Sequence, residues 1–117
     1  MEKQKRQKNT RVVEKTVMVA DIGKMPPQAR ELEEAVLGAL MLEKDAFSII
    51  SDILTAESFY ETTHQSIFGA IHNLAMQQKP VDVLTVVEEL KRRGELEQIG
   101  GAVYVAELTD KVASAAH

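Results

Sequence analysis

Residues 59–108 carry the pattern that decides the fold, and they read FYETTHQSIFGAIHNLAMQQKPVDVLTVVEELKRRGELEQIGGAVYVAEL. Apolar side chains recur in this stretch every three or four residues, which is typical of helices with one buried face. Turn residues interrupt the pattern at residues 79–82, at Gly94 and at Gly100-Gly101. No part of it alternates usefully with the period of two that a half-buried strand requires. The sequence therefore predicts an all-α fold.

The segment before this stretch adds two more helices. The first covers residues 28–42, and its second half is apolar on every side, so we expect it to be the central helix of the core. Gly38 within it is expected at a close helix–helix contact. Its first turns hold three acids that complement the helix dipole, Glu31, Glu33 and Glu34. Asp45 should cap a second helix that extends through Leu54.

Three helices are expected within the stretch itself. The first begins at a capping box formed by Thr62 and Gln65. The second begins after Asp82, a good N-cap residue, and ends at Gly94, which takes the left-handed C′ conformation without the steric cost of a Cβ. The third follows residues 100–101. Five or six short helices with tight connections should cross at steep angles, as a compact orthogonal bundle rather than a long parallel one.

Charge divides the chain into two parts. Residues 1–25 hold seven Lys or Arg and three acids, whereas residues 26–117 hold seven bases and fifteen acids. We expect the first part to be a flexible basic arm, although it also suits contact with DNA. It has no aromatic side chain that would stack on a base. The acidic remainder repels nucleic-acid phosphate and is a poor candidate for direct DNA binding.

The sequence gives little support for a catalytic or metal-binding site. There is no cysteine, and His64 and His72 lie eight residues apart, too far along a helix to share a zinc ion without further ligands. His64 is expected to pack and to make a local hydrogen bond. No phosphate-binding loop is present, adjacent acids point about 100° apart on a helix, and no serine has a nearby His/Asp partner. We therefore expect no catalytic, cofactor-binding or metal-binding residue in this chain.

Two other features have a structural and a functional interpretation. The basic cluster Lys91-Arg92-Arg93 suits phosphate, but three cations in a last helical turn are also what the helix dipole favours. The pair Gly100-Gly101 suits an anion at a helix N-terminus, but a turn explains it better. No apolar run approaches the roughly 20 residues needed to span a bilayer, so no membrane partner is expected.

One set of residues follows the order and spacing of a known family. The set begins with Pro26-Pro27. Its further members are Leu37, Gly38, Leu40, Phe59, Tyr60, Ile67, Phe68, Pro80, Asp82, Leu90, Gly94, Gly100, Gly101 and Tyr104. With this set, residues 26–113 resemble the N-terminal domain of the bacterial replicative DNA helicase, the DnaB family. The aromatic and aliphatic members, including Phe59, Tyr60 and Phe68, are expected in the core, and the last three glycines at turns.

The resemblance implies a role rather than a reaction. It implies a non-catalytic oligomerisation and partner-docking domain, the collar, of a hexameric ATP-dependent helicase that unwinds duplex DNA at the replication fork in the bacterial cytoplasm. Six subunits would form a trimer of dimers, with primase and the helicase loader docking on the collar. ATP, Mg²⁺ and single-stranded DNA would bind a motor domain outside this chain. Residues 114–117 would begin the hairpin and linker that lead to that motor.

Other interpretations stay open from the residues alone. The chain also suits the helicase-binding domain of a primase, although that domain lies at the C-terminus of its protein. A stand-alone helical DNA-binding or adaptor domain is a third possibility, which the acidic body disfavours. Without the hairpin, we expect this piece to be a monomer or a weak dimer.

Overall fold

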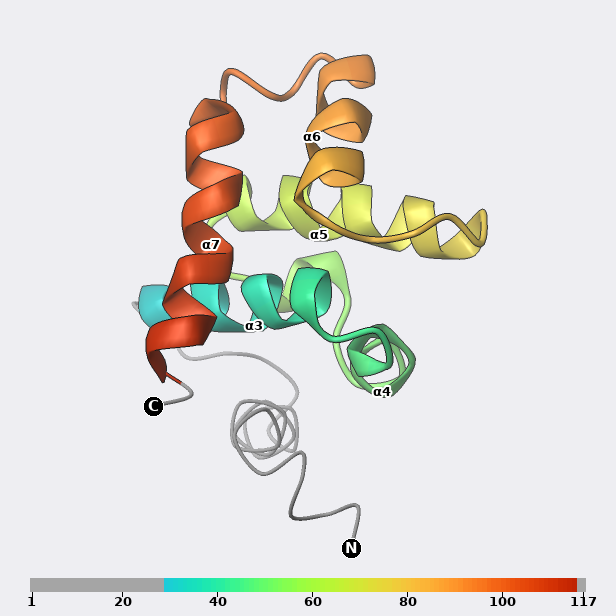
Figure 1. Ribbon diagram of the computed structural model, residues 1–117, viewed down its shortest axis with the longest axis vertical. Helices are drawn as coiled ribbons and strands as arrows, with labels where there is room; N and C mark the ends of the chain where they lie inside the picture. The colour runs from blue at the N-terminus through green and yellow to red at the C-terminus, as the bar shows by residue number, and fades with distance from the viewer. Residues whose placement is uncertain (1–28, 116–117) are drawn as a thin grey trace, which may run out of the picture.

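The apolar run predicted as the central helix lies at the centre of the fold. In the computed structural model, which describes residues 29–115, α3 (Arg30–Leu42) buries every residue from Val36 to Met41. α5 (Thr62–Met76) lies alongside α3, and α7 (Gly101–Ala115) crosses both at a steep angle (Figure 1). The stretch that was expected to be the central helix therefore forms one layer with α5, and α7 lies across it.

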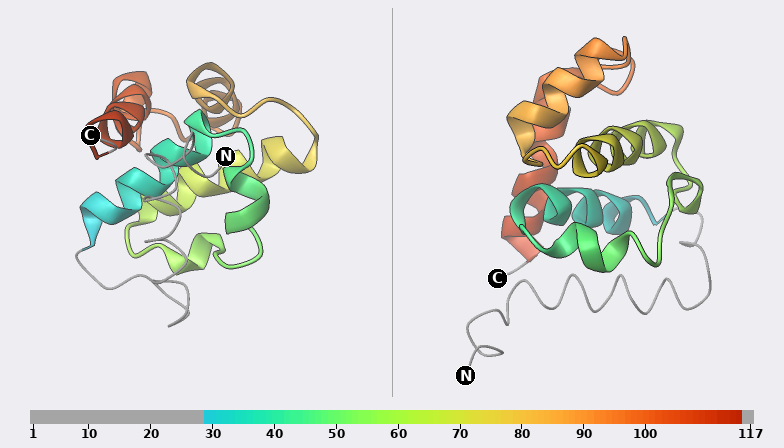
Figure 2. Two further views of the ribbon diagram at one scale, coloured as in Figure 1. Left: turned by 60° about the horizontal axis from the view of Figure 1, so that its bottom comes forward. Right: turned by 90° about the vertical axis from the view of Figure 1, so that its right-hand side faces the viewer.

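The remaining elements close the fold. α6 (Val83–Arg92) packs on α5 and on α7, while the short α4 (Ala46–Ile50) and a 3₁₀ turn, η1 (Ala56–Ser58), cover the end of α3 and α5. The two further views show α6 and α7 crossing the α3–α5 layer rather than running along it (Figure 2). The described residues contain no strand, and the prediction of an all-α orthogonal bundle is confirmed.

The core is a continuous apolar cluster. Phe68 is 2% exposed and packs its ring against Phe59 at a centroid distance of 5.2 Å and against Phe47 at 6.3 Å. Aliphatic side chains from four helices complete the cluster, among them Leu37, Leu40, Ile67, Ile71, Val86, Leu90, Val105 and Leu108. Burial of this one surface by α3, α5, α6 and α7 holds the helices in place.

Gly38 lies where α7 crosses α3. A Cβ built there would overlap the backbone carbonyl of Leu108 and would lie 2.6 Å from Cγ2 of Val112. Only glycine leaves room for α7 to approach the α3 backbone this closely. The expected close helix–helix contact is therefore present, and its partner is α7.

The glycines expected at turns have left-handed backbone angles. Gly94 has a φ of 72° directly after the C-cap of α6, and Gly100 and Gly101 have φ values of 110° and 79° before α7. Asp82 is the N-cap of α6, and its side chain accepts a hydrogen bond from the Thr85 backbone N–H at 2.9 Å. These local signals therefore mark both ends of α6 and the start of α7.

Several expectations about local structure were wrong. Tyr60 was expected in the core but is 62% exposed, because Phe59 and Tyr60 lie in an irregular segment where neighbouring side chains point in different directions and only Phe59 faces inward. Thr62 and Gln65 form no capping box, since Glu61 is the N-cap of α5 and the Gln65 amide donates to the Phe59 carbonyl. The second helix stops at Ile50 instead of continuing through Leu54. The expectations for residues 1–28 and 116–117 lie outside the described residues.

Candidate functional site

A buried polar cluster joins three helices where α3, α5 and α7 meet. We call it the junction, and it comprises Arg30, Glu33, Glu34, His64, Tyr104 and Lys111. Glu33 and His64 have no exposed surface, and Glu34 is 3% exposed. Groups so buried must be hydrogen-bonded to be tolerated.

Glu33 lies at the inner end of the cluster. Its Oε1 is 2.6 Å from Nδ1 of His64, and its Oε2 accepts the backbone N–H of Tyr60 at 2.6 Å. The backbone N–H of Glu61 also donates to Oε1, at 3.5 Å. Glu33 of α3 thereby holds both the start of α5 and the loop before it. The exposed Tyr60 therefore contributes to the junction through its backbone and not through its ring.

His64 connects that carboxylate to α7. Its Nε2 is 2.7 Å from the Oη of Tyr104, and the two ring planes are nearly parallel, with an angle of 4° between them. The hydroxyl of Tyr104 in turn donates to Oε2 of Glu34 at 2.8 Å. A chain of three short contacts therefore runs from α3 through α5 and α7 back to α3.

The outer end of the junction carries opposite charges. Lys111 Nζ lies 3.2 Å from Oε1 of Glu34, and Arg30 Nε lies 3.5 Å from its Oε2. Burial alone would raise the pKa of Glu34, but the hydrogen bonds from Tyr104 and Lys111 and the two nearby cations outweigh it, so that the pKa is lowered. Burial, followed by the hydrogen bond to Glu34, raises the pKa of Tyr104. Glu34 is thus a carboxylate and Tyr104 a neutral phenol at neutral pH.

The sequence interpretation placed these residues differently. Glu33 and Glu34 were expected as dipole-compensating acids of a first turn, and His64 was expected to bond locally. The structure instead pairs His64 with residues 31 and 40 positions away. The available signal was helical phase, because Glu33 lies on the same stripe as Leu37 and Leu40, and His64 on the same stripe as Ile67 and Phe68.

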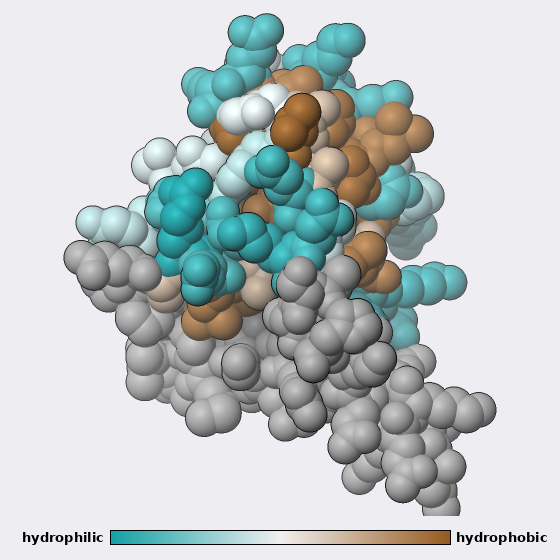
Figure 3. Space-filling model, turned by 60° about the vertical axis from the view of Figure 1, so that its left-hand side comes forward, coloured by the Kyte–Doolittle hydropathy of each residue, from teal (hydrophilic) through white to brown (hydrophobic). Residues whose placement is uncertain are grey.

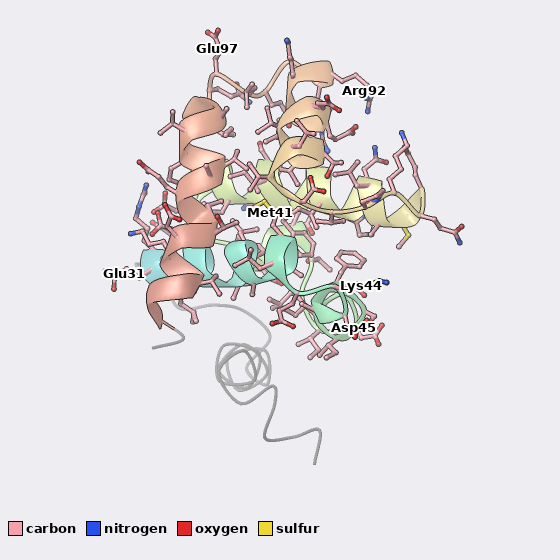
Figure 4. All side chains as sticks on the ribbon, in the orientation of Figure 1. Glu31, Met41, Lys44, Asp45, Arg92 and Glu97 are labelled. Carbon is pink, nitrogen blue, oxygen red and sulfur yellow. The ribbon has the colours of Figure 1, made fainter. Side chains whose placement is uncertain are left out.

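A groove lies at the other end of α3. It measures about 710 Å³ and is lined by the C-terminal end of α3, by α4 and by the loop from α5 to α6, including Met41, Lys44, Phe47, Lys79 and Pro80. Met41 points from α3 toward α5, and Lys44 lies at the turn into α4 (Figure 4). The lining is mostly apolar with a few charged side chains, a composition that suits a peptide or helix better than a small polar substrate.

The other candidate residues of the sequence are used structurally. Arg92 extends outward from the end of α6 (Figure 4) and donates to the Glu89 carboxylate at 2.7 and 3.1 Å, while Arg93 lies 3.3 Å from Glu95. The hydrogen bond from Arg92 is the main cause that lowers the pKa of Glu89. His72 is exposed and contacts the edge of the Phe47 ring. Within the described residues there is no group of three or more metal-ligating side chains.

Several large apolar side chains of the described residues are exposed at the surface. Leu84, Val103, Met76 and Leu42 are each more than half exposed. The face shown in Figure 3 mixes hydrophilic side chains across its middle with hydrophobic ones toward its upper right.

None of the helices in the described part of the chain is long and apolar enough to cross a membrane.

Comparison with known proteins identifies the family. Residues 25–117 match the family model described as the DnaB-like helicase N terminal domain. The chain belongs to this family. It is 56% identical over 95 residues to the replicative DNA helicase DnaB of Rhodothermus marinus and 46% identical over 94 residues to that of Geobacillus stearothermophilus. These matches cover 81% and 80% of the chain but only 10% and 21% of those relatives.

A solved structure supports the same assignment. The crystal structure of the N-terminal domain of DnaB helicase from Mycobacterium tuberculosis matches with a TM-score of 0.71 and 39% sequence identity, over 79% of this chain and 66% of that chain. The resemblance inferred from the spacing of the signature residues is therefore confirmed. The chain spans a tenth to about a fifth of the length of the two DnaB relatives named above.

Proposed function

We propose that this chain is the non-catalytic collar domain of a hexameric, ATP-dependent replicative DNA helicase, and that it serves subunit association and partner docking. The observation that carries the proposal is the match of residues 25–117 to the family model of the DnaB-like helicase N terminal domain, together with the similarity to proteins named replicative DNA helicase, of which the chain covers only a small part. ATP and Mg²⁺ would then be bound by a motor domain elsewhere in the protein, which would also translocate on single-stranded DNA in the cytoplasm.

The surface of the domain supports docking. The groove between α3, α4 and the α5–α6 loop and the exposed Leu84 and Val103 offer apolar contact area, which is the usual centre of a protein interface. Primase, the helicase loader and neighbouring subunits are the partners that the family resemblance implies. The acidic charge of residues 26–117 is consistent with protein partners rather than direct DNA contact.

The test uses the complete product of the gene that encodes this chain. Light scattering should give a mass of six subunits, and the product should hydrolyse ATP and unwind a forked duplex. A version without residues 1–117 should keep ATP hydrolysis but lose its response to primase. A complete product without ATP hydrolysis, or a primase response that survives the deletion, would count against the proposal.

Surface variants separate docking from folding. Leu84→Asp and Val103→Asp place a charge on two exposed apolar positions, and Gln77→Asp is the matched control at an exposed polar position. At least one of the first two should weaken binding to primase or loader about tenfold or more, with unchanged thermal unfolding. Equal binding by all three variants would move the docking surface elsewhere, and the groove would be tested next with Leu42→Asp.

A further inference from the structure

The hydrogen-bond chain of the junction requires a specific number of protons. It has three links: Glu33 to His64, His64 to Tyr104, and Tyr104 to Glu34. Each link needs one hydrogen between its two heavy atoms. A neutral histidine and a phenol supply only two hydrogens between them. A third must therefore reside on one of the two carboxyl groups or on the ring.

Glu34 does not hold the third proton. Its oxygens face Lys111 at 3.2 Å and Arg30 at 3.5 Å, and the Tyr104 hydroxyl donates to it. Its lowered pKa agrees with that surrounding. A protonated Glu34 would also have to reverse the bond from Tyr104.

Glu33 is an equally poor site for the third proton. Two backbone N–H groups, from Tyr60 and Glu61, already donate to its oxygens. A carboxylate with donors on both oxygens is stabilised in its charged form. A protonated Glu33 could give its hydrogen only to Nδ1 of His64, and it would accept the two backbone N–H groups less strongly than a carboxylate does.

We propose that His64 is a buried imidazolium in the folded domain, so that folding takes up one proton, and that this proton ties α7 to α3 and α5. Nδ1–H then donates to Glu33, Nε2–H donates to Tyr104, and Tyr104 donates to Glu34. All three links are satisfied, and the ring charge lies between two carboxylates. On the helices that pack here the facing charged and titratable groups are Arg30, Glu33 and Glu34 of α3 and Tyr104 and Lys111 of α7, with Glu61 before α5. Glu89 of α6 is directed elsewhere, to Asn73 and Arg92.

The consequence for stability has a definite sign. An ordinary histidine, as in the unfolded chain, is half protonated at about pH 6.5. Above that pH the folded domain binds more protons than the unfolded chain, so its stability falls as pH rises, by up to about tenfold in the folding equilibrium constant per pH unit. The stabilisation is complete below that pH, and raising the pH weakens the attachment of α7.

Nitrogen NMR of the histidine ring tests the proposal directly in the 117-residue chain. His72→Gln and His117→Gln leave His64 as the sole histidine. At about pH 8, where a free imidazole is neutral, both ring nitrogens of His64 should carry a proton. A ring with one unprotonated nitrogen at that pH overturns the proposal.

A single substitution should reverse the direction of two of the three hydrogen bonds. In Glu34→Gln the amide N–H₂ group donates to Tyr104, whose hydroxyl then donates to Nε2, so His64 should become neutral while all three links remain. Glu61→Gln is the matched control, since it removes one negative charge beside the junction from a side chain that pairs with Arg30 at 2.7 Å and not with Tyr104, and it should leave the ring cationic. A cationic ring in Glu34→Gln, or a neutral one in Glu61→Gln, contradicts the proposal.

Stability measurements give an independent readout. Chemical unfolding of the native chain should show a free energy of unfolding that falls as the pH rises from about 7 to 9. In Glu34→Gln the free energy of unfolding should not change over this range. If Glu34→Gln does not fold, Tyr104→Phe replaces it: Nε2 then has no acceptor, so the ring should again be neutral and the profile flat. A native profile that is flat in this range overturns the proposal.

Discussion

The apolar core around Phe68 and the polar junction around His64 hold the same helices by different means. The core packs side chains that need only the right size and an absence of water, so its contribution changes little with pH. The junction depends on charged groups whose partners come from three helices, so each partner that is lost leaves a buried group unsatisfied. The core therefore supplies the bulk of the stability, and the junction fixes how α7 lies on α3 and α5.

The largest expected effect tests the core. Phe68→Ala removes a ring that is 2% exposed and contacts Phe47 and Phe59, and it should lower the free energy of unfolding by about 3–5 kcal/mol at any pH between about 6 and 9. Chemical denaturation measures the loss. Met76→Ala, at a side chain that is 60% exposed, is the control and should cost less than about 0.5 kcal/mol. A loss for Phe68→Ala near that of the control would show that Phe68 is not part of the core.

The second prediction concerns the contact between the two regions, where α7 crosses α3. Gly38→Ala places a methyl group against the Leu108 backbone, which cannot move aside, so it should cost about 1–3 kcal/mol even though alanine favours the helix. Gly69→Ala is a matched control on α5, since its methyl group meets only the flexible end of Arg93 at 3.2 Å. The control should be neutral or gain up to about 1 kcal/mol. Equal effects would mean that α7 does not approach α3 so closely.

These two regions also differ in how far the sequence predicts them. Helical period and turn residues are local signals, so the helix ends at Asp82 and Gly94, the buried stripe of α5 and the central position of α3 follow from them. The junction joins residues up to 70 positions apart, and no local rule says which acid meets which ring. Helical phase is enough to put Glu33 and His64 on buried stripes, although Glu33 was interpreted only as a dipole-compensating acid; their partners depend on how α7 crosses α3. That crossing is a property of the packed fold.

The third prediction probes the outer end of the junction in acid. Burial opposes the ionisation of Glu34, but its hydrogen bonds and cationic neighbours outweigh that and lower its pKa. A lowered pKa means that the stabilisation is present above the ordinary range of about 4.3 and is lost as the pH falls through the folded value. The effect should be smaller than those above, since Arg30 and Lys111 are 53% and 49% exposed and solvent screens them.

Thermal unfolding followed from about pH 6 to pH 3 measures this loss. Lys111→Gln removes one of the groups that lower the pKa of Glu34 and should flatten part of the profile, and Glu57→Gln, which changes an exposed acid of η1, should leave it unchanged. Identical profiles for the two variants would indicate that other acids account for the whole of the acid sensitivity.

The smallest expected effect compares two helix ends that have the same geometry but different residues. After α5, Lys79 N–H donates to the Leu74 carbonyl and Gln78 takes a φ of 59°. After α6, Glu95 N–H donates to the Leu90 carbonyl and Gly94 takes a φ of 72°. Both are left-handed C′ caps of the same kind, and the sequence predicted only the one with glycine.

Because glycine adopts this conformation without a Cβ penalty, Gln78→Gly should stabilise the domain by about 0.5–1 kcal/mol, and the reverse exchange Gly94→Gln should destabilise it by a similar amount. Neither position buries a side chain, so packing changes should not obscure the difference. Chemical denaturation of the two variants and of the double exchange measures it, and the double exchange should return close to the native value, since the two sites are independent. If Gln78→Gly destabilises the domain, the Gln78 side chain contributes more than its backbone conformation costs, and the α5–α6 loop at the groove depends on that side chain.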